Sequence, residues 1–77
     1  MLAAHQSLRN FYISLKWSDP ILAAIISEDI LEVSLCALYD DKRVGQPAAN
    51  RLRARTNDVP EALGRILNNA LTEMGYE

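Results

Sequence analysis

The sequence predicts a mostly α-helical domain, a small bundle of four or five short helices with a helix-turn-helix-like arrangement. Apolar residues recur with helical spacing over residues 59–74, and residues 47–55 contain good helix formers and no β-branched residue. Proline and glycine divide the chain into short segments, which Pro20, Pro47 and Pro60 open and Gly45 and Gly75 close. The alternative fold is a small α+β layer with a hairpin and a C-terminal helix.

The chain's length limits it to one domain. Its 77 residues have room for a single small core, so residues 1–77 are interpreted as one domain. Residues 1–6 are expected to fray, as chain termini do, and can be disordered.

Residues 8–17 fit two secondary structures equally well. Phe11, Ile13, Leu15 and Trp17 alternate with more polar residues, as in a half-buried strand. Helical spacing also fits, with Ser7 as the N-cap and an apolar face that holds Leu8, Phe11, Tyr12 and Leu15. The pattern alone does not decide between the two.

Residues 19–39 favour helix. Asp19 and Pro20 have the residue types of an N-cap and a first helical position, and predict a short helix over residues 21–26. Residues 28–39 also alternate like a strand, but Ser27 is a good N-cap, and Glu28 and Asp29 suit the positive end of a helix dipole. Helix is therefore preferred, and the two helical segments can run together.

The last two segments are also predicted to be helical. Residues 47–55 favour helix by composition, although Arg51, Arg53 and Arg55 alternate as a strand would allow. For residues 59–74, Asp58 and Glu61 form a capping-box pattern and Pro60 occupies the first turn. Gly75 is suited to a left-handed residue at the helix end. The apolar stripe of this helix consists of Leu63, Ile66, Leu67, Ala70, Leu71 and Met74.

Charge is divided along the chain into blocks of opposite sign. Residues 1–18 carry a net charge of +2, residues 19–41 of −6, residues 42–65 of +4 and residues 66–77 of −2. The basic block could contact nucleic acid phosphates, or acidic and basic surfaces of different molecules could face each other. The third interpretation is that the blocks neutralise each other within one molecule or are solvated.

The function expected from this charge pattern is nucleic-acid binding through residues 42–65. Guanidinium groups bind phosphate or carboxylate in a forked geometry and keep their charge. The alternative is an adaptor or inhibitor that binds a protein and self-associates. The residues predicted to bind nucleic acid are Lys42, Arg43, Arg51, Arg53, Arg55, Arg65, Asn68 and Asn69.

The sequence contains no pattern typical of an enzyme. His5 is the only histidine, and Cys36 is the only cysteine and lies in an apolar segment. Asp40 and Asp41 are adjacent carboxylates without an oxygen-rich loop around them. We therefore expect no catalysis, no cofactor and no metal site.

Two aromatic residues are candidates for an interface. Tyr12 and Trp17 are large amphipathic side chains in a small chain, and they either anchor a partner or complete the core. No apolar run is long enough to span a membrane and no signal peptide is recognisable, so a cytoplasmic protein is expected. A homodimer is also expected, because a domain of this size has a small core.

Part of the chain resembles the small helix-turn-helix or winged-helix modules of phage and plasmid replication proteins. The resemblance runs from Ser27-Glu28-Asp29-Ile30-Leu31 through the basic connector and Glu61-Ala62-Leu63-Gly64-Arg65-Ile66-Leu67 to Met74-Gly75-Tyr76. It implies that residues 59–74 form a recognition helix. Arg65, Asn68 and Asn69 would then face the bases of DNA.

A second resemblance follows from the alternative fold. Residues 56–63 contain the pattern Thr-x-x-x-Pro-Glu-Ala-Leu. This pattern is similar to that of small phage-encoded proteins in which a hairpin precedes a helix, including anti-CRISPR-like inhibitors. The resemblance implies a protein that blocks a host protein.

Overall fold

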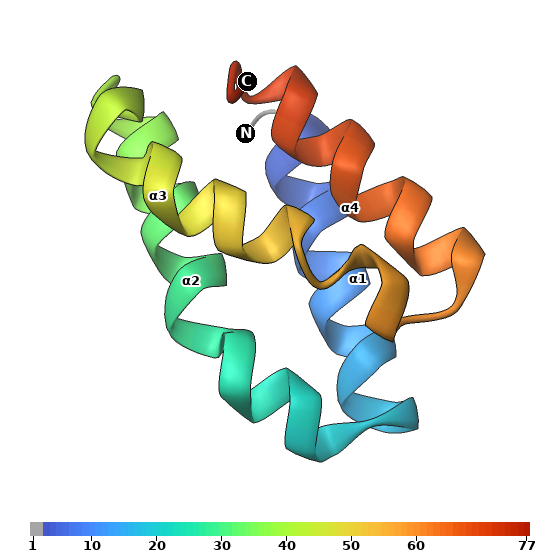
Figure 1. Cartoon of the computed structure of the whole chain (residues 1–77). Helices are drawn as coiled ribbons and strands as arrows, with labels where there is room; N and C mark the ends of the chain where they lie inside the picture. Colours follow the sequence, from blue (N-terminus) through green and yellow to red (C-terminus); the bar gives the residue numbers. More distant parts are fainter. Residues whose placement is uncertain (1–2) are drawn as a thin grey trace.

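The computed structural model describes residues 3–77, and it arranges them as four α-helices and one short 3-10 helix (Figure 1). No strand occurs among these residues. The prediction of a mostly α-helical small bundle is therefore confirmed, and the α+β alternative is wrong. The elements are α1 (Ala3–Ser18), α2 (Pro20–Leu38), α3 (Lys42–Arg53), η1 (Thr56–Asp58) and α4 (Glu61–Glu73).

The helices pack around one apolar core. α1 and α2 form an antiparallel hairpin, α3 packs on α2, and α4 lies along α1 (Figure 1). Each of the four α-helices contributes to the core, and no polar or charged residue among residues 3–77 is buried in it. The largest fully buried side chains are Leu8, Phe11, Leu15, Val33, Leu52, Leu67 and Leu71.

Residues 8–17 belong to a single helix, α1. The helical interpretation is correct here because the stripe of Leu8, Phe11 and Leu15 faces the core, whereas the strand pattern would have required Ile13 and Trp17 to share that face. Residues 3–6 form the first turn of α1, and residues 1–2 of the segment expected to fray lie outside the described residues. His5 Nε2 donates to the Ser34 carbonyl at 3.2 Å, which ties α1 to α2.

The two predicted helical segments of residues 19–39 run together as α2. Asp19 caps the helix, since its side chain accepts a hydrogen bond from the Leu22 amide at 3.1 Å. Ser27 is not an N-cap, because its hydroxyl donates to the Ala24 carbonyl within a continuous helix. The helix ends in a Schellman motif, with Asp40 in the left-handed region at φ 55°.

α3 begins earlier than predicted. It starts at Lys42, so Gly45 and Pro47 lie inside the helix, and the prediction that they close and open segments is wrong. Gly45 is required by packing, because a Cβ there would lie 2.8 Å from Cys36 Cβ and 2.5 Å from the Tyr76 hydroxyl. Pro47 is exposed, and because it has no amide hydrogen it cannot donate the helical hydrogen bond to the Arg43 carbonyl.

α4 is the predicted C-terminal helix, shortened at its start. It begins at Glu61, and the residue at the N-cap position is Pro60, without a side-chain cap. Asp58 does not cap α4, because it ends η1 and pairs with Arg55. Gly75 has φ 100° and ends the helix with a Schellman motif, as predicted.

Candidate interaction surfaces

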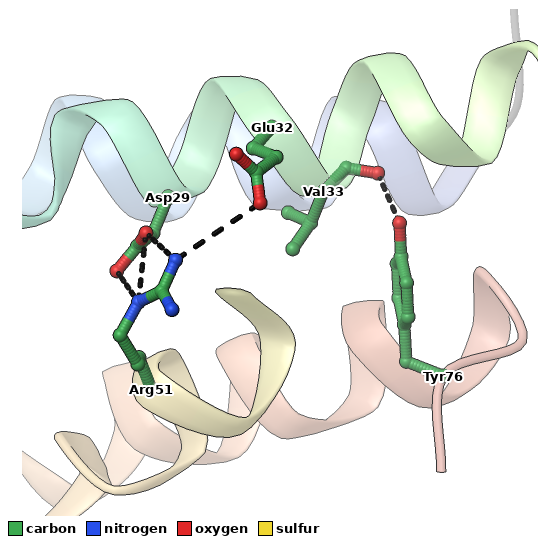
Figure 2. A network of polar contacts seen from close by, with 5 residues as sticks. All are labelled: Asp29, Glu32, Val33, Arg51 and Tyr76. Carbon is green, nitrogen blue, oxygen red and sulfur yellow. Dashed lines mark hydrogen bonds and ion pairs between the residues drawn. The ribbon is translucent and has the colours of Figure 1, made fainter. Parts of the chain in front are cut away.

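The basic block on α3 faces carboxylates of the same molecule. Arg51 reaches across to α2, where its guanidinium binds both oxygens of Asp29 at 2.9–3.2 Å and lies 4.0 Å from Glu32 (Figure 2). The hydrogen bond and the charge of Asp29 raise the pKa of Arg51. The acidic block of residues 19–41 and the basic block of residues 42–65 thus neutralise each other in part within one molecule.

Four of the other five predicted basic ligands are also engaged within the molecule. Arg53 donates to Asn68 Oδ1, Thr72 Oγ1 and the Tyr76 carbonyl, and so holds the end of α4. Exposed ion pairs join Arg55 to Asp58 at 3.7 Å, Arg65 to Glu61 at 2.8 Å, and Lys42 to Asp40 at 3.9 Å. Of the six predicted basic ligands, Arg43 and Arg53 have no carboxylate partner among residues 3–77, and Arg53 is held by hydrogen bonds to neutral groups instead.

The two asparagines predicted on α4 have different surroundings. Asn68 is half-buried and accepts the hydrogen bond from Arg53. Asn69 is exposed and lines a shallow hollow between α1 and α4 with Ser7 and Ile66. The pair therefore does not form one free polar surface on α4.

Only one of the two predicted aromatic anchors is free. Tyr12 is half-buried and packs against the core, whereas the Trp17 side chain is 87% exposed. Trp17 shares one helix face with Ile13 and Lys16, and the three side chains line a hollow of about 370 Å³. Together with Arg9, one turn earlier on the same side of the helix, these residues are called the α1 face: Arg9, Ile13, Lys16 and Trp17.

The charges of the α1 face have no acidic partner within the described part of the chain. Neither Arg9 nor Lys16 has a carboxylate within 4.0 Å among residues 3–77, and both are exposed. Ile13 is 42% exposed. The α1 face thus combines two unpaired cations with two uncovered apolar side chains.

α2 carries a second apolar stripe opposite the one that faces the core. The buried side of the helix includes Leu22, Ile26 and Val33. The other side has large exposed side chains, among them Ile21 at 75% and Leu31 at 60% exposure. A helix that is apolar all round is usually buried on all sides. These residues are called the α2 outer face: Ile21, Ile25, Leu31, Leu35 and Leu38.

The α2 outer face was not singled out in the sequence analysis. Its signal is present in the sequence, since residues 20–38 contain apolar residues at nearly every helical angle. Local spacing does not show which of these side chains stay uncovered, because that depends on where α1 and α3 pack on α2.

A groove with an acidic border lies between the α2 outer face and the start of α3. Its volume is about 540 Å³, and Leu31, Leu35 and Val44 supply apolar walls. Glu28 and Glu32 lie on the same groove, and Glu28 has no ion-pair partner among residues 3–77. The residues that line this groove are Glu28, Leu31, Glu32, Leu35, Cys36 and Val44.

Cys36 lies in the groove as a free thiol with an unfavourable setting for ionisation. Burial, followed by the negative charges of Asp41 and Glu32, raises the pKa of the Cys36 thiol. Since the thiolate is the nucleophilic form, this environment makes Cys36 a slow nucleophile.

Tyr76 fixes the chain's end beneath the groove. Its buried hydroxyl donates to the Val33 carbonyl on α2 at 2.7 Å (Figure 2). Burial, and then the nearby Cys36, Glu32 and Asp41, raise the pKa of Tyr76 to about 12. This bond and the packing of Tyr76 on Gly45 hold α2, α3 and the end of α4 together.

Residues 3–77 contain no cluster of three or more His, Cys, Asp or Glu side chains placed to hold a metal ion. None of the helices described combines the length and the apolarity that a bilayer crossing requires.

Comparisons with protein-family models, with curated proteins and with solved structures find no match to this chain. Its function therefore has to be inferred from its own surfaces.

Proposed function

We propose that this chain is a non-catalytic interaction module that binds protein through the α2 outer face. The observation that carries the proposal is that α2 is apolar on two opposite sides and the fold covers only one of them. Large apolar side chains left exposed together on one side of a helix, with charged residues beside them, are typical of protein-binding sites. The groove beside it, with its acidic border, supplies polar groups that orient a partner.

The dimensions of the molecule support a partner rather than an incomplete fold. Its accessible surface is 4955 Å², close to the roughly 4700 Å² expected for a folded monomer of its mass. Its radius of gyration is 11.1 Å, against about 11.5 Å expected for a compact chain of this length. The chain is therefore compact with its α2 outer face exposed, which supports the proposal that this face is available to another molecule.

Nucleic-acid binding has weaker support. A phosphate would have to compete with Asp29 for Arg51, with Asp58 for Arg55 and with Glu61 for Arg65. Such exposed pairs are individually weak, so the competition is possible, but it lowers the net positive charge offered to a polyanion. The apolar α2 outer face contributes nothing to phosphate binding.

Site-specific photo-cross-linking tests the proposal. A photoreactive amino acid at Leu35 is expected to give discrete protein adducts, whereas the same group at the exposed residue Asn57 on η1 gives none. The absence of adducts at Leu35 above the Asn57 control would overturn the proposed function.

A titration with short duplex and single-stranded DNA tests the other function. We expect no salt-sensitive binding in the micromolar range. Tight binding at low salt that is lost in Arg51→Ala/Arg53→Ala would favour the nucleic-acid function instead.

A further inference from the structure

We propose that the α2–α3 groove is filled by the α1 face of a second copy of this chain, so that copies assemble head to tail. This inference rests on the proposed function and names the partner of the same surface. Two observations carry it, the charge complementarity of the two surfaces and their matching apolar content.

The two surfaces have opposite charges that the described fold leaves available. The α1 face presents Arg9 and Lys16, which have no carboxylate partner among residues 3–77. The groove presents Glu28, also unpaired over that range, and Glu32, whose contact with Arg51 is long at 4.0 Å. Opposite charges on two surfaces steer association and set its orientation.

The apolar parts of the two surfaces also correspond. Ile13 lies between the two cations of the α1 face and Trp17 follows Lys16, while Leu31, Leu35 and Val44 line the groove. The exposed indole of Trp17 is the type of aromatic anchor that such a groove accommodates.

A symmetric dimer made by the α2 outer face alone fits less well. A two-fold axis at the middle of α2 would place Glu28 and Glu32 next to the same residues of the other copy. Like charges across an interface are repulsive. Pairing the acidic groove with the basic α1 face avoids this repulsion and leaves one free surface at each end of the assembly.

Sedimentation of the full chain from micromolar to millimolar concentration tests the proposal, with two built-in reporters. Trp17 is the only tryptophan and Cys36 the only cysteine. We expect the average mass to rise with concentration, the tryptophan emission to shift to the blue, and alkylation of Cys36 to slow in parallel. All three changes report on contact between the α1 face and the groove.

Charge reversal supplies the variants. Arg9→Glu/Lys16→Glu and Glu28→Lys/Glu32→Lys are each expected to weaken association at least about tenfold, because each places like charges together. An equimolar mixture of the two variants should regain association, since each altered surface meets opposite charge on the other.

The matched control is Glu61→Lys/Glu73→Lys on α4, which changes the net charge as the groove variant does. It should associate like the unaltered chain. Circular dichroism of every variant verifies that the helices are retained.

Three results would overturn the proposal. The first is a chain that stays monomeric at millimolar concentration. The second is association without a change in Trp17 emission, which would indicate a symmetric α2 dimer. The third is a mixture of the two charge-reversal variants that fails to regain association. Protein adducts at Leu35 together with a monomeric chain would refute the second copy as partner while leaving the proposed function intact.

Discussion

Gly45 lies where three segments pack so closely that a larger side chain is not tolerated. An alanine Cβ would come within 2.5 Å of the Tyr76 hydroxyl and 2.8 Å of Cys36 Cβ. Overpacking of this kind costs about 1–3 kcal/mol, which exceeds the roughly 0.5–1 kcal/mol that alanine normally gains over glycine in a helix. We therefore expect Gly45→Ala to lower the free energy of unfolding, measured by urea denaturation.

The control for this prediction is Arg43→Ala in the same helix. Arg43 is exposed, so its replacement should change stability by no more than about 0.5 kcal/mol. A Gly45→Ala variant as stable as the unaltered chain would contradict the close packing of α3 on Tyr76.

Tyr76 makes stability depend on alkaline pH. Its pKa in the folded chain is about 12, raised from 10.0, so the fold favours the neutral phenol. This contribution is fully present below pH 10 and is lost as the pH rises through 12. Tyr76→Phe should make the free energy of unfolding fall less at alkaline pH. At pH 7 it should cost about 1 kcal/mol of stability, because the hydrogen bond to the Val33 carbonyl is lost.

The measurement is urea unfolding, followed by circular dichroism, at pH 7 and at pH 11. Tyr39→Phe serves as the control, since Tyr39 is 75% exposed and its hydroxyl contributes no buried contact. If both variants had the same stability at pH 7, the bond from Tyr76 to α2 would have no energetic role.

Individual polar contacts were the part of the molecule that the sequence could not predict. The basic character of residues 42–65 was visible, but the pairing of Arg51 with Asp29 depends on how α3 crosses α2. The inward direction of Arg53 depends likewise on where α4 ends. Both contacts join residues more than 20 positions apart, and local patterns carry no information about such separations.

Helix ends depend on caps that differ in strength. Asp19 and Asp41 both occupy N-cap positions, but only Asp19 accepts a side-chain hydrogen bond from its helix. We expect Asp19→Ala to cost about 1 kcal/mol of stability, and Asp41→Ala to cost clearly less. Equal losses in thermal unfolding would show that capping by the Asp19 side chain does not stabilise α2.

Whole elements were more predictable than their boundaries. The stripe of residues 59–74 predicted α4, and Asp19-Pro20 predicted the start of α2, because both signals are local. Gly45 and Pro47 led to a wrong start for α3, because both residues usually break helices. Within α3, Gly45 is accommodated because it packs closely on Tyr76, and Pro47 because it is exposed. For residues 8–17 the choice between helix and strand depended on what α4 covers, which lies outside that segment.

The candidate surface was hidden for a related reason. The apolar side chains of α2 are all visible in the sequence, but which of them remain uncovered depends on the positions of α1 and α3. The sequence did not distinguish Tyr12 from Trp17 as an interface residue, and only the structure shows that Tyr12 packs against the core while Trp17 protrudes on the α1 face. A sequence pattern identifies apolar residues, whereas only the packed bundle shows which of them lack a partner.

For the molecule as a whole, self-association and stability are coupled. A partner that binds only the folded state raises the free energy of unfolding in proportion to the logarithm of its concentration. If copies of this chain cover each other's α2–α3 grooves, the midpoint of thermal unfolding should rise with protein concentration. The rise should be smaller at high salt, because screening weakens the attraction between Arg9 or Lys16 and Glu28.

Differential scanning calorimetry over a hundredfold range of concentration measures this coupling. The Glu28→Lys/Glu32→Lys variant should unfold at the same temperature throughout the range, while Glu61→Lys/Glu73→Lys should retain the concentration dependence. A midpoint independent of concentration in the unaltered chain would mean that the folded monomer is stable with its α2 outer face in water. That result would leave a protein other than this chain as the partner to be sought for the α2 outer face.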